Sequence, residues 1–172
     1  KPSPRLSPSR KRAFATALSS HGIILAAVPA SYAATAAWNT DASSGNFNTA
    51  QWSNAGTPIA GGTYTVLSGD SLVFGTSTTT TLNNDLTGAT YAGLTFNSGA
   101  SAFTIGGNSF TLTGNITNNS ASLQTINNAI AISGARTINA ASGQLILGGN
   151  LTGNTGTKLE PAPGQTVIAH GP

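Results

Sequence analysis

Short triplets with an apolar, a small and an apolar residue recur through residues 93–154 and constrain the fold of this chain most strongly. Phe110-Thr-Leu112 and Ile130-Ala-Ile132 are examples, and Gly, Asn and Ser separate them from their neighbours. In a β-strand, successive side chains point to opposite faces, so each triplet places both apolar side chains on one face. Gly, Asn and Ser are typical turn residues. The pattern therefore predicts many short strands, each with one buried face, joined by tight turns.

The triplets also repeat along the sequence. Residues 109–119 align with residues 144–154 at an offset of 35, and residues 130–134 align with residues 110–114 at an offset of 20. A third alignment, between residues 94–96 and the Phe110 triplet, has an offset of 16. These offsets indicate a repeat unit of about 15–20 residues, which is too short to be stable alone, so the copies have to stack on one another.

A stacked unit of this length, with strand signals and no helix signal, predicts an all-β fold, a parallel β-helix or β-solenoid. Gly and Asn at the corners tolerate left-handed backbone angles, and stacked asparagines can pair their amides between coils. An antiparallel sandwich shares the alternation and the turns but predicts no constant repeat. The residues expected to face inward are Leu94, Phe96, Phe103, Ile105, Phe110, Leu112, Ile130, Ile132, Ile138, Leu145 and Leu147.

The N-terminal residues 1–33 have the three regions of a secretory signal peptide. Residues 1–12 carry five of the seven basic residues, residues 13–28 are uncharged and mostly apolar, and Ser31 and Ala33 have the spacing that a signal peptidase reads. A membrane-spanning helix is the alternative, but it needs about 20 apolar residues. We therefore expect a signal-peptide helix cleaved after Ala33, or in second place after Ala36, and an exported protein located outside the cell or on the bacterial outer surface.

Residues 34–66 contain both tryptophans of the chain, Trp38 and Trp52, among turn residues. Aromatic residues spaced in this way predict a hairpin. In the favoured interpretation the hairpin is an aromatic cap over the first coil, because repeat folds need covered ends. In the alternative, Trp38 and Trp52 stack on sugar rings while Asn39 and Asp41 bind the hydroxyl groups, which would make the segment a carbohydrate-binding module.

The remaining boundaries follow from where the repeat pattern starts and stops. Residues 67–154 are expected to be the β-solenoid. Residues 155–172, which contain three prolines, are expected to be a poorly ordered tail with one last strand at residues 166–169. Such a tail leaves the last coil uncovered, so we expect the natural protein to continue beyond Pro172.

Charge and chemistry narrow the possible functions. From Ala34 onward the chain has two basic and four acidic residues. It therefore has no basic stripe that could bind the phosphate backbone of a nucleic acid, and we expect no nucleic-acid partner. The chain has no cysteine, and its two histidines have no partners nearby in sequence, so we expect no metal and no cofactor. Asp70 and Asp85 could share calcium or a proton on adjacent coils, but an Asp after Gly or Asn is more often a turn residue. We therefore expect a protein that is not an enzyme.

A further function, ice binding, would require threonines in register on one face. The threonine-rich run of residues 76–81, which includes Ser77, is consecutive in the sequence instead. A structural role therefore remains the favoured interpretation, with adhesion or matrix contact through an outer surface of Thr and Asn.

Several segments resemble the bacterial autotransporter-associated β-strand repeat proteins. They are the tryptophan-rich opening of residues 38–52, Tyr91-Ala-Gly-Leu-Thr-Phe96, Phe103-Thr-Ile-Gly-Gly107 and Ser109-Phe-Thr-Leu-Thr-Gly-Asn-Ile-Thr-Asn118. The resemblance covers residues 37–154. It implies a secreted or surface-displayed parallel β-helix that acts as a passenger or stalk, with extracellular polysaccharide or other surface proteins as partners. It implies contact with a membrane only through the signal peptide or a C-terminal anchor, whose pattern does not follow Asn154.

Overall fold

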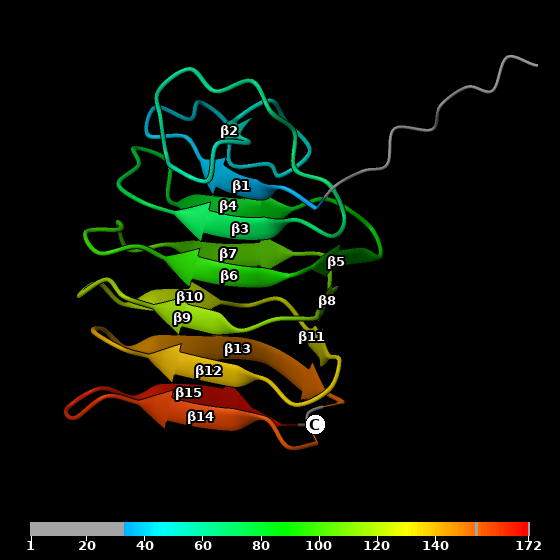
Figure 1. The fold of residues 1–172 in the computed structure, drawn as a ribbon, viewed down its shortest axis with the longest axis vertical. Helices are drawn as coiled ribbons and strands as arrows, with labels where there is room; N and C mark the ends of the chain where they lie inside the picture. The colour runs from blue at the N-terminus through cyan, green and yellow to red at the C-terminus, as the bar shows by residue number, and fades with distance from the viewer. Residues whose placement is uncertain (1–32, 154, 172) are drawn as a thin grey trace, which may run out of the picture. The chain divides into compact units, whose positions relative to one another are not determined.

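The computed structural model describes residues 33–153 and 155–171, which form strands and turns without any helix. The chain winds as a parallel β-solenoid of about four turns, and successive coils lie above one another from the N-terminal to the C-terminal strands (Figure 1). All strand pairs but one are parallel, so the antiparallel sandwich is excluded for the described residues. The expected signal peptide, residues 1–33, lies outside the described residues except for Ala33.

Each coil contributes strands to three faces. The first face contains β1 (Thr35–Trp38), β3 (Ser71–Phe74), β6 (Gly93–Phe96), β9 (Ile116–Asn118), β12 (Thr137–Ala140) and β14 (Lys158–Pro161). The second face contains β4 (Thr81–Asn84), β7 (Thr104–Gly107), β10 (Gln124–Ile126), the first half of β13 (Leu145–Thr152) and β15 (Val167–His170). The third face contains β5 (Ala89–Tyr91), β8 (Phe110–Leu112), β11 (Ile130–Ile132) and the end of β13.

From β3 onward one coil takes 20 to 23 residues, which corrects the expected unit of 15–20, whereas the first coil, from β1 to β3, takes 36. On the first face, Leu72, Leu94, Ile116 and Ile138 occupy one register position at intervals of 22 residues. The offset of 20 that aligned Ile130 with Phe110 is a true coil repeat. The offset of 35 is not, because Phe110 lies on the third face whereas Leu145 pairs with Gln124 on the second. All three faces use similar triplets, so the sequence alignment matched different faces.

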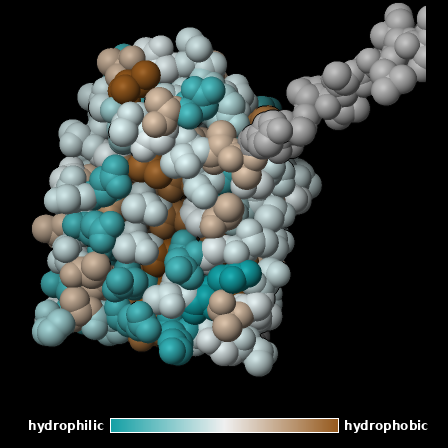
Figure 2. All heavy atoms as spheres, viewed as in Figure 1, coloured by the Kyte–Doolittle hydropathy of each residue, from teal (hydrophilic) through white to brown (hydrophobic). Residues whose placement is uncertain are grey.

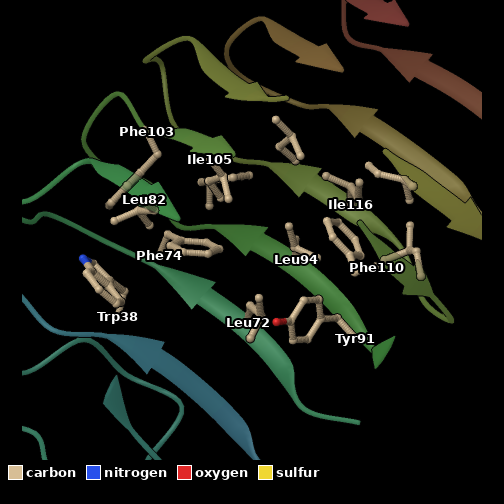
Figure 3. Packing of buried hydrophobic residues seen from close by; sticks show 14 of the residues in the cluster. Trp38, Leu72, Phe74, Leu82, Tyr91, Leu94, Phe103, Ile105, Phe110 and Ile116 are labelled. Atoms are coloured by element: carbon tan, nitrogen blue, oxygen red, sulfur yellow. The ribbon is translucent and has the colours of Figure 1, made fainter. Parts of the chain in front are cut away.

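The core fills the space between the faces, as the alternation predicts. All eleven residues expected to face inward are buried, each at most 4% exposed. Figure 3 shows Phe74 and Leu94 from the first face meeting Leu82 and Ile105 from the second. The rings of Phe74 and Phe96 stack at 4.9 Å between centroids, because the two residues occupy the same register position on adjacent coils. Burial of these side chains against the next coil supplies the main stabilising energy.

Asparagine amides pair between coils at one place, as expected, where Asn83 Nδ2 donates to Asn46 Oδ1 at 3.1 Å. The buried amides at the corners bond backbone carbonyls instead. Asn84 and Asn128 are almost fully buried, and both donate from Nδ2 to the carbonyl oxygen of Asn108, which lies on the coil between them. An amide that bonds a backbone carbonyl satisfies a polar group that the turn would otherwise bury without a partner. The expected left-handed asparagines are also absent, since positive φ angles in the described residues occur at glycines alone.

The last coil corrects the expected tail. Residues 155–172 were expected to be poorly ordered, but β14 pairs in parallel with β12, and β15 pairs in parallel with β13. β15 agrees with the single strand expected at residues 166–169. The strand Lys158–Pro161 was not predicted, because its charged residues and its proline obscure the alternation of apolar and polar residues. A strand at the end of a sheet tolerates both residue types. No further coil covers these strands in the described residues, so the inward-facing Leu159 remains 48% exposed. Ile168 is 44% exposed because it points outward, in register with Ile146.

Candidate functional site

The two tryptophans of the proposed sugar-binding site are fully buried. Trp38 lies at the end of β1 opposite Trp52 of β2 (Trp52–Ser53), and both side chains are 0% exposed. Their rings meet edge to face at 4.9 Å with an angle of 77° between planes. Both indole N–H groups donate to backbone carbonyls, that of Trp38 to Thr79 and that of Trp52 to Phe47. Neither ring offers a free face, so the geometry favours the capping interpretation over sugar stacking.

Asn39 and Asp41 lie beside these rings but bind the backbone of the chain itself. Asn39 is buried, and its Nδ2 donates to the carbonyl oxygen of Gly62 at 2.8 Å. Asp41 is exposed, and its two carboxylate oxygens accept the Gly61 N–H at 2.9 and 3.1 Å. Hydrogen bonds from these two residues therefore fix the loop around residues 59–62 against the first coil.

Residues of the same loop line an open hollow of about 360 Å³. It is lined by Ser53, Asn54, Ala55, Ile59, Gly61, Gly62, Thr63 and Tyr64. Its polar groups are the hydroxyl groups of Ser53, Thr63 and Tyr64, the side-chain amide of Asn54, and backbone N–H and C=O groups. Among these, the phenol of Tyr64 is the titratable group. Such a hollow can accept a small neutral polar molecule, but it brings no acid and base pair together.

Asp70 is the buried carboxyl group nearest to this segment, and it is 1% exposed. Its Oδ1 accepts the Ala34 N–H at 2.8 Å, while Oδ2 accepts the Leu67 N–H at 2.8 Å and the Tyr64 O–H at 2.7 Å. Burial, and then the hydrogen bond and charge of Asp70, raise the pKa of Tyr64 to about 12. Three donors from two segments of the chain, residue 34 and residues 64–67, thus converge on one carboxyl group.

The other carboxyl group considered for calcium or proton sharing has a different task. Asp85 is exposed and accepts the Asn48 N–H at 2.7 Å. Tyr91 is buried and donates to Oδ1 of Asn84 at 2.9 Å, and its pKa is raised by burial first and then by the charges of Asp85 and Asp70. Asp70 and Asp85 share no hydrogen-bond donor, so each acts as the turn residue that the alternative interpretation expected.

A smaller hollow of about 140 Å³ contains Arg136 and Lys158, which are the Arg and Lys of the described residues. They come from neighbouring coils, since the Lys158 N–H donates to the carbonyl oxygen of Arg136. Asn115, Ala135, Thr137 and Gly156 complete the lining. Sequence reasoning treated these two cations as scattered, because a separation of 22 residues becomes adjacency only once the coil length is known.

Outward positions carry mostly uncharged polar residues. Thr81, Thr104 and Thr125 stand in register on the second face, followed by Ile146 and Ile168 in the same column. Threonines are therefore stacked over three coils, which the consecutive run of residues 76–81 did not reveal. Figure 2 shows pale and teal residues over most of one face, with brown residues in a narrow, broken line.

The described residues contain neither a candidate metal-ligand group nor a candidate membrane-spanning helix. No group of three or more His, Asp or Glu side chains converges in residues 33–153 and 155–171. Over the same residues, no helix has the length and hydropathy that crossing a membrane requires.

Sequence reasoning missed the buried amides of Asn84, Asn118, Gln124 and Asn128. A usable signal was present, because Asn83-Asn84, Asn118-Asn119 and Asn127-Asn128 are doublets at strand ends. In each doublet one side chain turns into the core, which a reading of asparagine as a surface residue does not predict.

Comparisons of the chain with protein-family models, curated proteins and solved structures returned no match.

Proposed function

We propose that the chain is a structural β-solenoid of an exported protein, a passenger-type scaffold that makes adhesive or matrix contacts and carries out no catalysis. The observation that carries the proposal is the use of the polar groups. Asp41, Asp70 and Asp85 all accept hydrogen bonds from backbone N–H groups, and none belongs to a group of three or more acidic or histidine side chains in the described residues. Their contacts hold loops and coils together, which is the work of a scaffold.

The outer surface supports a contact role. The threonine column on the second face, and the register pairs Thr95 with Thr117 and Thr90 with Thr111, present hydroxyl groups at the spacing of adjacent strands, about 4.8 Å. A regular polar surface of low charge makes many weak contacts with polysaccharide or with other surface proteins. The resemblance of residues 37–154 to autotransporter-associated repeats supports a passenger or stalk within a larger exported protein.

The alternative function, carbohydrate binding by a dedicated module, has to use another surface than the one first proposed. Trp38 and Trp52 are closed inside the fold, so a Trp52→Ala variant would damage the packing and would not report on binding. The hollow beside Tyr64 is the place where a sugar could contact an aromatic side chain.

Export is tested by fusing residues 1–36 to a phosphatase that becomes active only after export from a bacterial cytoplasm. We expect an active reporter, and loss of activity when a charge is placed in the apolar segment by Leu25→Arg. A reporter that remains inactive, or a Leu25→Arg fusion that is equally active, would argue against the proposal.

Contact is tested by co-sedimentation of the purified chain with neutral and acidic polysaccharides. Thr117→Lys alters an outward register position, whereas Ala55→Trp fills the hollow. A scaffold that binds through its faces loses binding with Thr117→Lys and retains it with Ala55→Trp. The reverse result would favour the carbohydrate-binding module.

A further inference from the structure

The buried carboxyl group of Asp70 faces the residue that would become the N terminus after signal-peptide removal. Its Oδ1 lies 2.8 Å from the backbone nitrogen of Ala34, the residue after the expected cleavage site at Ala33. Asp70 itself is 1% exposed. In the continuous chain all three of its donors, the amides of Ala34 and Leu67 and the phenol of Tyr64, are neutral. A carboxylate removed from water is stabilised far better by a cation than by neutral donors.

No cation of the described residues reaches Asp70, because Arg136 and Lys158 both line the small hollow around Thr137. Hydrolysis of the Ala33–Ala34 peptide bond would supply one. The C–N bond breaks, water gives a hydroxyl group to the Ala33 carbonyl carbon and a proton to the Ala34 nitrogen, and the amine takes up a second proton near neutral pH. The nitrogen that now donates one hydrogen bond becomes an ammonium group with three donors.

The position of Ala34 also distinguishes between the two candidate cleavage sites. The Ala34 carbonyl oxygen accepts the Ser71 N–H at 2.9 Å, and Ala36 is fully buried in register with Leu72. Cleavage after Ala36 would remove both contacts and half of β1. Cleavage after Ala33 keeps β1 whole and leaves its first residue beside the carboxyl group.

We propose that processing after Ala33 creates an α-ammonium group on Ala34 that pairs with Asp70 and fastens β1 to β3. The proposal rests on the proposed export. The cut precedes folding, since in the folded chain the nitrogen and oxygen of Ala34 are both engaged. The mature chain is therefore more stable than its precursor, because one end of the solenoid gains a buried ion pair.

The test compares purified chains that begin at Ala34 with a free or an acetylated amine, because acetylation keeps one neutral N–H donor and removes the charge. At about pH 6 the free amine is protonated. Tyr64 and Tyr91, whose pKa values Asp70 helps to raise, stay neutral there, because even an ordinary tyrosine has a pKa of about 10. We expect the free amine to raise the melting temperature by at least about 3 °C. Equal melting temperatures would overturn the proposal.

Two variants show whether Asp70 is the partner. The effect of acetylation should vanish in Asp70→Asn and persist in Asp85→Asn, which removes a carboxyl group that holds a different turn. An effect that persists in Asp70→Asn overturns the pairing. If Asp70→Asn fails to fold, nuclear magnetic resonance titration of the Ala34 methyl group in the unaltered chain decides. The pairing requires a pKa for the amine above its ordinary value of about 7.7–8.0, and a value within or below that range contradicts it.

Mass spectrometry of the protein recovered after export identifies its first residue. Ala34 supports the proposal, and any other first residue overturns the assigned cleavage site. A chain that is not exported contradicts the proposed function instead, and the melting comparison on purified chains still decides whether the ion pair forms.

Discussion

Gly114 shows how closely the backbones of adjacent coils approach at a corner. It lies between β8 and β9, and a Cβ atom built on it would overlap the carbonyl oxygen of Ala92 on the preceding coil. The three nearest atoms all belong to the backbone of Ala92 and Gly93, so no flexible side chain could move away. The many glycines of the sequence thus serve two purposes, close approach as at Gly114 and left-handed turns as at Gly134, where φ is 77°.

We predict that Gly114→Ala lowers the free energy of unfolding by about 1–3 kcal/mol, the cost of overpacking a filled site. Gly106→Ala is the matched control, because a Cβ atom there meets nothing within 4 Å. The control should change the free energy of unfolding by less than about 1 kcal/mol. Urea denaturation measures both values, and an equal effect of the two substitutions would contradict this account of the corner.

The pairing of Tyr64 with Asp70 predicts a pH dependence at the residue scale. The pKa of Tyr64 is raised from 10.0 to about 12 in the folded chain, so the folded state holds this proton more tightly than the unfolded state. The resulting stabilisation is present below about pH 10 and is lost as the pH rises through about 12.

Tyr64→Phe should therefore reduce the fall in the free energy of unfolding between pH 10 and about 12. Tyr91 contributes in the same direction and accounts for a remaining fall, because its pKa is also raised. Urea denaturation at several pH values measures the slope. If the free energy of unfolding of Tyr64→Phe falls with pH as steeply as that of the unaltered chain, the Tyr64 phenol does not interact with Asp70.

At the scale of elements, stability depends on whether a strand has neighbours on both sides. Ile116 of β9 and Leu159 of β14 occupy the same register column of the first face. Ile116 is fully buried between two coils, whereas Leu159 is 48% exposed because it belongs to the last coil of the described residues. Each coil is stabilised mainly by its nearest neighbours, as in other repeat proteins.

Ile116→Ala should cost about 2–5 kcal/mol, since it leaves a cavity in the middle of the stack. Leu159→Ala at the same register position should cost less than about 1 kcal/mol, because most of the removed surface is near solvent. Thermal and urea denaturation compare the two variants. Similar losses would mean that the last coil is covered in solution.

For the whole molecule, the sequence predicts the fold class and the core, because alternation alone decides which side of a strand is buried. It does not predict the coil length, since triplets such as Phe110-Thr-Leu112 and Leu145-Ile-Leu147 look alike although they lie on different faces.

The candidate site was predictable only in part, because alternation does not specify the surroundings of a side chain. Trp38 and Trp52 were correctly placed together, but their burial depends on loops far along the chain, such as the Thr79 carbonyl that accepts from Trp38. The contact between Asp70 and Ala34 joins residues 36 positions apart and leaves no sequence signal of its own.

The central claim is that coils of about 22 residues stack in register, and a series of spin-label distances tests it most directly. The chain has no cysteine, so single cysteines can be introduced at outward positions of the first face. A label at Thr95 is paired in turn with labels at Thr117, Asn139 and Glu160, which lie one, two and three coils away. The stack predicts backbone separations that rise evenly, by about 4.8 Å per coil. A distance to Glu160 no longer than the distance to Thr117 would contradict the solenoid.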